Sequence, residues 1–159
     1  MTSPTTDPAS APRSPEDASY RFVDLEKVGE HRFKATNARG GVLPVGHGED
    51  PDFTPVELLL AGLAGCGALD LDFIAGKRAP FATFAARADG HKVRDEQGNR
   101  MVGLTVTFDV TFPEGPEGDA ARAVLAPTLQ RVQDRLCTVG RTVTVGDEVR
   151  YVEGPLSGS

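Results

Sequence analysis

The sequence predicts a mixed α+β domain, and three observations lead to that fold class. Short segments with strand character come first, at residues 20–28, 31–36 and 42–45, separated by turn sequences that contain Gly. A long apolar stretch with helix-start signals follows. After it comes an alternating apolar segment typical of an antiparallel strand. Because strands, helix and hairpin come in blocks, the order favours α+β over a βαβ repeat.

Composition and charge limit the classes of protein and partner. The 159 residues are the length of one domain with a real core. The formal charge is -6 and no Lys/Arg cluster occurs, so a nucleic acid is not an expected partner. Residues 1–19 are rich in Ser, Thr, Pro and Ala, which predicts a disordered tail. We therefore expect a domain at 20–153 and a flexible C-terminus at 154–159.

The expected compartment is the cytoplasm. Residues 1–19 lack the basic start and apolar run of a secretory signal. The longest uncharged apolar stretch, 58–69, is well short of the roughly 18 residues of a membrane span, so no membrane partner is expected. In a reducing cytosol two cysteines do not indicate a structural disulfide. They are also too few for a four-cysteine metal site, and the three histidines have no metal-ligand spacing, so no metal is expected.

The first predicted helix has the clearest local signals in the chain. Thr54 is a good N-cap, Pro55 suits the first helical position, and Glu57 completes a capping box. Residues 58–74 are apolar on nearly every side, which predicts a helix buried all round. Several glycines lie within it. Because Gly in a helix costs up to about 1 kcal/mol relative to Ala, we expect another element to pack very close.

The second half of the chain predicts a hairpin and a second helix. Apolar and polar residues alternate through 102–112, as in a half-buried antiparallel strand, and 81–94 is its expected hairpin partner. Apolar residues then repeat at helical spacing through 121–136, with Pro127 inside, where it should kink the helix. A short helical turn at 138–145 and a last strand at 148–152 complete the prediction.

Cys66 and Cys137 are either buried hydrophobes or a redox pair. Cys66 lies too far into its helix for the helix N-terminus to lower its pKa, so a thiolate there needs a nearby cation. Arg39, in a Gly-flanked turn, is either an exposed side chain or that cation. Glu57 is either only a cap or also functional. Asp70 is on the same helix face as Cys66, and we interpret it as solvated or capping.

Two motifs resemble those of the OsmC/Ohr family. Residues 54–66, TPVELLLAGLAGC, followed by Asp70, are similar to its "SPxELLLAALGGCxxxD" helix. Residues 136–143, LCTVGRTV, before Gly146, resemble its second motif, "C-[ST]-V-x-[RK]-T-L…G". Both occur in the family's order, with a predicted hairpin and helix between them. The resemblance covers residues 20–152.

The resemblance implies an OsmC-like fold and a peroxidase activity. Two three-stranded antiparallel β segments would form sheets around long buried central helices in an intertwined homodimer. In the family's well-studied members the first cysteine, here Cys66, attacks an organic hydroperoxide and becomes a sulfenic acid. The second cysteine, here Cys137, then forms a disulfide with it, which an external dithiol reduces. No metal or organic cofactor takes part.

One departure leaves two functions open. Val56 stands where the characterised peroxidases have a Glu that orients the activating Arg, and Glu57 lies about 100° further around the helix. The chain thus resembles the broader branch of the family with a P-[MV]-E-L motif. One hypothesis is an organic hydroperoxide reductase whose catalytic residues are Cys66, Cys137, Arg39 and Glu57. The alternative is a non-catalytic stress protein that binds a small apolar ligand or senses oxidants.

Overall fold

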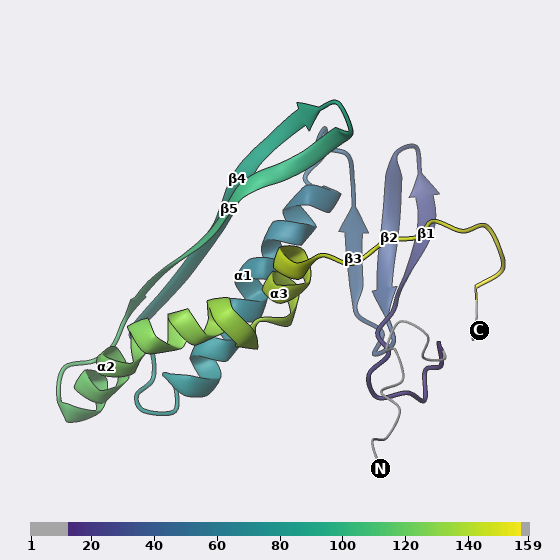
Figure 1. Ribbon diagram of the computed structural model, residues 1–159. Coiled ribbons are helices and arrows are strands. Elements are labelled where there is room, and N and C mark those ends of the chain that lie inside the picture. The colour runs from purple at the N-terminus through teal and green to yellow at the C-terminus, as the bar shows by residue number, and fades with distance from the viewer. Residues whose placement is uncertain (1–12, 157–159) are drawn as a thin grey trace, which may run out of the picture. The chain divides into compact units, whose positions relative to one another are not determined.

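The computed structural model describes residues 13–156, which fall into two compact units (Figure 1). Of these residues, the first unit contains 13–53 together with 149–156, and the second is Thr54–Glu148. Residues 1–12 of the predicted N-terminal tail and residues 157–159 of the predicted C-terminal segment lie outside the described residues.

The first unit is built on an antiparallel sheet in the order β1-β2-β3. Its strands are β1 (Val23–Gly29), β2 (Arg32–Asn37) and β3 (Val42–Val45), which confirms the three predicted strand segments. Ala35 on the central strand β2 is paired with Leu25 on β1 and with Leu43 on β3. Because side chains alternate between the faces of a sheet, these three lie on the same face.

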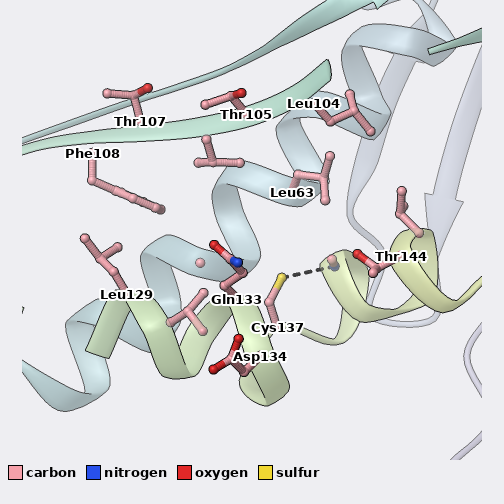
Figure 2. Close-up of a pocket in the computed structure, with 15 residues that line it drawn as sticks. Leu63, Leu104, Thr105, Thr107, Phe108, Leu129, Gln133, Asp134, Cys137 and Thr144 are labelled. Carbon is pink, nitrogen blue, oxygen red and sulfur yellow. Dashed lines mark hydrogen bonds between the residues drawn. The ribbon is translucent and has the colours of Figure 1, made fainter. Parts of the chain in front are cut away.

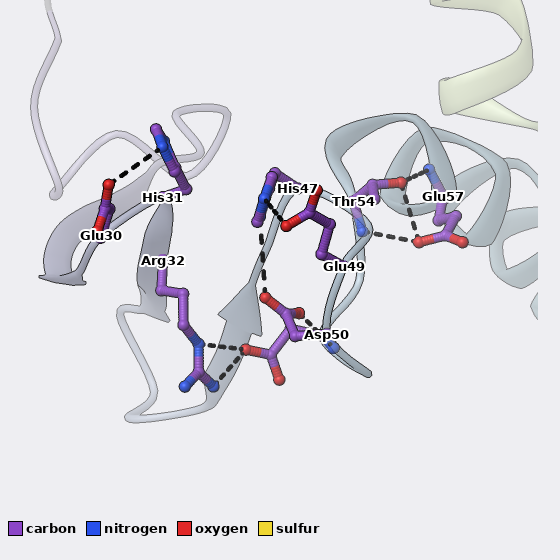
Figure 3. A network of polar contacts seen from close by, with 9 residues as sticks. Glu30, His31, Arg32, His47, Glu49, Asp50, Thr54 and Glu57 are labelled. Carbon is purple, nitrogen blue, oxygen red and sulfur yellow. Dashed lines mark hydrogen bonds and ion pairs between the residues drawn. The ribbon is translucent and has the colours of Figure 1, made fainter.

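Polar contacts connect the strand ends of the first unit (Figure 3). In the β1–β2 turn His31 has φ 53°, a conformation uncommon outside Gly. Arg32 donates to Asp52 at 2.7 Å and so joins β2 to the loop after β3. The His31 and His47 rings are 5.1 Å apart, and His47 Nε2 lies 3.3 Å from Glu49. Among the described residues, no three His, Cys, Asp or Glu side chains are grouped to hold a metal ion.

The predicted strand at 148–152 is wrong. These residues have no strand structure, and within the described chain no backbone hydrogen bond joins them to a strand. Residues 152–156 instead line a cavity of about 380 Å³ with Tyr20, Phe22 and other residues of the N-terminal segment. A strand forms only where a sheet edge supplies hydrogen-bond partners, and the described residues supply none to this segment. The second predicted three-stranded segment therefore has two strands.

The second unit begins with α1 (Pro55–Ile74), whose predicted capping box is confirmed (Figure 3). The Thr54 hydroxyl accepts from the Glu57 backbone N–H at 3.3 Å, and the Glu57 carboxylate accepts from the Thr54 N–H at 2.7 Å. The two strands that follow, β4 (Thr83–Asp95) and β5 (Gly98–Thr111), pair as one long antiparallel hairpin. Residues on the predicted inner face of β5 are half-buried and alternate with exposed residues of the other face, as expected for a strand with one covered face.

The helical end of the second unit has a π-helical turn that the sequence does not predict. The predicted second helix is α2 (Pro116–Arg131), with Pro127 inside it, and it leads into the π-helix η2 (Val132–Leu136). The predicted helical turn at 138–145 is confirmed as α3 (Thr138–Val145). Helix α1 packs against β4 and against α2, η2 and α3 (Figure 1). No helix of the described residues is long and apolar enough to cross a bilayer.

The prediction that the first helix is buried all round is wrong for the single chain. Only Leu63, Gly67 and Leu71 of α1 are buried, whereas Leu69 is 60% and Phe73 61% exposed. The exposed residues follow one another every four positions, so they share one helix face. We call this face the α1 apolar stripe; it consists of Ala61, Gly65, Leu69 and Phe73. No element of the described chain buries the stripe, which explains why an apolar helix has an exposed side.

Close packing is confirmed at Gly67. A Cβ atom there would lie 2.9 Å from Cζ of Phe108 on β5 and 3.6 Å from a methyl group of Val132. Gly67→Ala should therefore lower the free energy of unfolding by about 1–3 kcal/mol, the usual effect of overpacking. Urea denaturation measures the change.

Gly62→Ala is the matched control, because a Cβ at Gly62 meets only Val139 at an ordinary 3.7 Å. It should raise stability by up to about 1 kcal/mol through helix propensity. Equal effects of the two substitutions would contradict the close approach of β5 to α1.

Candidate functional site

Cys137 lies at the junction of η2 and α3, where the backbone changes from helical to extended. Its φ and ψ are -68° and 104°, and its N–H donates to the Val132 carbonyl at 3.2 Å, which closes the π-helical turn. Such single π turns occur often at functional sites. Cys137 is buried, with 6% of its surface exposed.

The Cys137 sulfur caps α3. The Gly140 N–H donates to Sγ at 3.2 Å (Figure 2). A Cβ at Gly140 would lie 3.2 Å from that sulfur and 4.0 Å from Leu63 of α1, so the missing side chain leaves room for both. The first turn of α3 therefore holds the Cys137 thiol toward α1.

The surroundings of Cys137 favour the neutral thiol. Burial raises the pKa of the Cys137 thiol, and the neighbouring Cys66 side chain raises it further. The Gly140 N–H lowers this pKa, but the charges of Cys66 and Asp70 act with burial, and the net shift is upward. Two conclusions follow. Cys66 and Cys137, both free cysteines, are neighbours, and Cys137 is protonated at neutral pH.

Cys66 lies on the side of α1 that faces the η2–α3 junction. Leu63 and Asp70 are three and four residues from Cys66, so they share its helix face. Cys66 itself is half-buried. The interpretation of Asp70 as a solvated or capping residue is wrong, because its Oδ2 is buried and has no hydrogen-bond partner among the described residues.

A largely apolar groove of about 970 Å³ is lined in part by Cys137 (Figure 2). One wall is the inner face of β5, and the others come from α1, the end of α2, η2 and α3. The Cys137 sulfur lies at its edge, and Gln133 and Asp134 add polar groups. The groove is wide enough for a small organic molecule. Its main apolar lining residues are Leu63, Leu104, Val106, Phe108, Leu129 and Val132.

The other two predicted site residues lie in turns and caps. Glu57 is exposed, and its carboxylate is held in the capping box by Thr54. Hydrogen bonds from the Thr54 backbone, and then from its hydroxyl, lower the pKa of Glu57. Arg39 is exposed in the β2–β3 turn of the first unit, where its N–H donates to the Asn37 side chain. Catalytic roles for Glu57 and Arg39 stay predictions.

Comparison with known proteins assigns the chain to a family. The family model described as OsmC-like protein matches residues 46–151, which include both cysteines. The chain belongs to the OsmC-like family. Comparison with curated protein sequences finds no significant match.

Solved structures share the OsmC-like fold at low sequence identity. A hypothetical protein from Aquifex aeolicus VF5 is 18% identical, with a TM-score of 0.61 over 79% of this chain and 87% of that one. An OsmC-like protein from Mycoplasma pneumoniae is 12% identical, with a TM-score of 0.59 over 80% and 89%. One of unknown function from Vibrio cholerae is 13% identical, with a TM-score of 0.58 over 78% and 93%. These likenesses show the fold alone.

Sequence reasoning missed three features of the site. The groove wall on β5 was predicted only as the inner face of a strand, and no pattern marks the π turn before Cys137. Asp70 did carry a signal: it is an acid on the same face as Cys66 in an otherwise apolar helix. An acid at that position indicates a carboxylate that is buried and needs a hydrogen-bond partner or a functional role.

The capping box makes a pH-dependent contribution to stability that can be measured. Because the pKa of Glu57 is lowered in the folded chain, its carboxylate stabilises the fold above its ordinary pKa of 4.5. That contribution is lost as the pH falls through the lowered value. Glu57→Gln keeps an acceptor for the Thr54 N–H but does not titrate.

We therefore expect wild type to lose its stability advantage over Glu57→Gln between neutral and acidic pH. Urea midpoints of the two proteins at pH 7 and pH 3 measure it. A difference that stays constant over this range would contradict the charged cap.

Proposed function

We propose that this OsmC-like protein is a thiol-dependent peroxidase that reduces organic hydroperoxides through Cys66 and Cys137. The observation that carries the proposal is the pair of neighbouring free thiols, of which Cys137 lines a largely apolar groove. A single thiol yields a sulfenic acid that must await another reductant. A neighbouring second thiol converts it within the same chain to a disulfide, which an external dithiol can reduce.

The two cysteines take different roles in the proposed reaction. The Cys66 thiolate attacks one peroxide oxygen, the O–O bond breaks, and the alkoxide takes up a proton to leave as an alcohol. Cys66 is now a sulfenic acid. The Cys137 thiol attacks its sulfur, water leaves, and the Cys66–Cys137 disulfide forms. The raised pKa of Cys137 supports this order, because a protonated thiol is a poor attacking group for the first step.

The groove supports an organic rather than a small inorganic peroxide. Its apolar walls on β5 and α1 suit the organic part of a hydroperoxide, and Cys137 lies at its edge. In this proposal Arg39 supplies the cation that stabilises the Cys66 thiolate, and Glu57 acts at the same site. A reducing compartment such as the cytoplasm would keep both thiols reduced between turnovers.

A homodimer is part of the proposal. The α1 apolar stripe leaves Leu69 and Phe73 mostly exposed, and contiguous exposed apolar surface marks protein contact sites. Cys66 lies beside this stripe on the helix. A second copy that covers the stripe would bury these side chains and shield the site from water. An intertwined dimer of the kind expected for the OsmC-like family would do both.

One observation favours the alternative, a non-catalytic ligand-binding or oxidant-sensing protein. Val56 stands where the family's peroxidases have an Arg-orienting Glu, and the neighbouring Glu57 is held by the helix cap. This alternative predicts slow stoichiometric oxidation of Cys66 without turnover.

Cysteine variants separate the two functions. With cumene hydroperoxide and a dithiol, wild type should consume peroxide over many turnovers, and Cys66→Ser should abolish consumption. Cys137→Ser should still form one sulfenic acid per chain, which a dimedone probe traps and mass spectrometry counts. Equal turnover by wild type and Cys66→Ser would exclude the peroxidase mechanism, and a single slow oxidation of wild type would favour the alternative.

Charge within the stripe should break the proposed dimer. Leu69→Glu places a carboxylate in the apolar contact, where a buried unpaired charge is strongly unfavourable. We expect a dimer for wild type and a monomer for Leu69→Glu by analytical ultracentrifugation. Val145→Glu is the control, because Val145 is 70% exposed and lies on α3 outside the stripe. Identical sedimentation of all three proteins would contradict the assignment of the interface.

A further inference from the structure

We propose that Asp70 accepts the proton of Cys137 when that thiol attacks oxidised Cys66. The inference deepens the proposed function, on which it rests for its natural substrate. Asp70 follows Cys66 by four residues, one helical turn, and shares its face of α1. Its Oδ2 is buried and has no hydrogen-bond partner among the described residues. Its charge acts on the Cys137 thiol.

An unpaired buried carboxylate oxygen calls for an explanation. Removing such an oxygen from water without a compensating hydrogen bond is unfavourable, and buried polar atoms are paired in the great majority of cases. Buried titratable groups beside reactive side chains are typical of functional sites. Helix α1 is otherwise apolar along this face, so a hydrophobic residue at position 70 would pack there without burying an unpaired polar atom.

The chemistry of disulfide formation requires a proton acceptor at this place. Cys137 is protonated at neutral pH because burial, Cys66 and Asp70 raise the pKa of its thiol. Its sulfur must lose the proton as it bonds to the Cys66 sulfur. In the proposed step Asp70 takes that proton, the S–O bond of the sulfenic acid breaks, and the departing hydroxide leaves as water after protonation. Asp70 passes the proton on to that hydroxide, directly or through solvent, so the step yields water and restores the carboxylate.

The other charged groups near Cys137 are less suited to this role. Asp134 lines the groove, but both of its carboxylate oxygens accept from Gln130, at 2.9 and 3.1 Å, and it is exposed. Arg141 donates to the Asp134 carbonyl at 3.1 Å, and Arg135 is exposed. The β5 wall opposite is lined by apolar and hydroxyl side chains. Asp70 is thus the carboxylate with a free buried oxygen on the Cys66 face.

The disulfide step can be isolated with an aryl disulfide that releases a coloured thiolate. The first release reports modification of Cys66, and the second reports displacement of the aryl group by Cys137. Rates of the second release are compared for wild type and Asp70→Asn between pH 6 and pH 9. We expect Asp70→Asn to be slower at pH 7 by at least about tenfold, since a general base commonly contributes 10²–10⁴-fold. Its rate should also rise about tenfold per pH unit, whereas the wild-type rate changes little.

Loss of the charge alone predicts the opposite result. Because Asp70 helps to raise the pKa of Cys137, its removal without a base role would make more thiolate and a faster second release. An equal or faster rate for Asp70→Asn at pH 7, or a slower rate with an unchanged pH profile, would overturn the proposal. Asp70→Glu keeps a carboxylate and should keep the wild-type pH profile.

Two further measurements complete the design. Asp72→Asn, an exposed acid on the same helix, should leave both releases unchanged. The first release shows that Cys66 of each variant is reactive, and circular dichroism shows that each variant is folded. Oxidation of the same proteins with cumene hydroperoxide tests the proposed function separately. If the hydroperoxide fails to oxidise Cys66 while Asp70→Asn slows the second release, the peroxidase proposal fails and the role of Asp70 stands.

Discussion

The close approach of α1 to its neighbours is the constraint on which the site depends. At Gly67 the helix leaves no room for a Cβ beside Phe108, and at Gly140 the first turn of α3 closes over the Cys137 sulfur. These two glycines fix the distance between the helix that carries Cys66 and the junction that carries Cys137. The adjacent thiols and the shape of the groove both follow from this packing.

Burial then gives the two cysteines different properties. Cys137 is enclosed at the η2–α3 junction, and its surroundings hold the pKa of its thiol high, although the Gly140 N–H opposes the shift. Cys66 is half-buried beside the exposed α1 apolar stripe. The same helix thus joins the proposed chemistry to the proposed dimer, because a partner on the stripe would also cover Cys66. We propose that Asp70, on the Cys66 face of α1, accepts the proton of Cys137, which its high pKa otherwise keeps on the thiol.

Local signals predicted much of the fold, and features that depend on distant contacts were harder to predict. The capping box at Thr54 and the three strands of the first unit follow from short-range chemistry, and both were predicted. The prediction of a strand at 148–152 was wrong because a strand also needs the edge of another strand to pair with. The prediction that α1 is buried on all sides was wrong because apolar composition does not say whether the same chain covers the helix. The neighbouring cysteines and the free oxygen of Asp70 depend on tertiary packing, so only the motifs indicated the pair.

The most direct test of the central claim is the connectivity of the disulfide formed on oxidation. Wild type is treated with one equivalent of cumene hydroperoxide per chain and alkylated without reduction; its intact mass under denaturing conditions separates bonds within a chain from bonds between chains, and its digest is mapped by mass spectrometry. The account predicts a single bond between Cys66 and Cys137 of the same chain, formed in wild type and restored to thiols by a dithiol. Oxidised Cys66 with Cys137 still alkylated as a free thiol, or a disulfide only between chains, would contradict it.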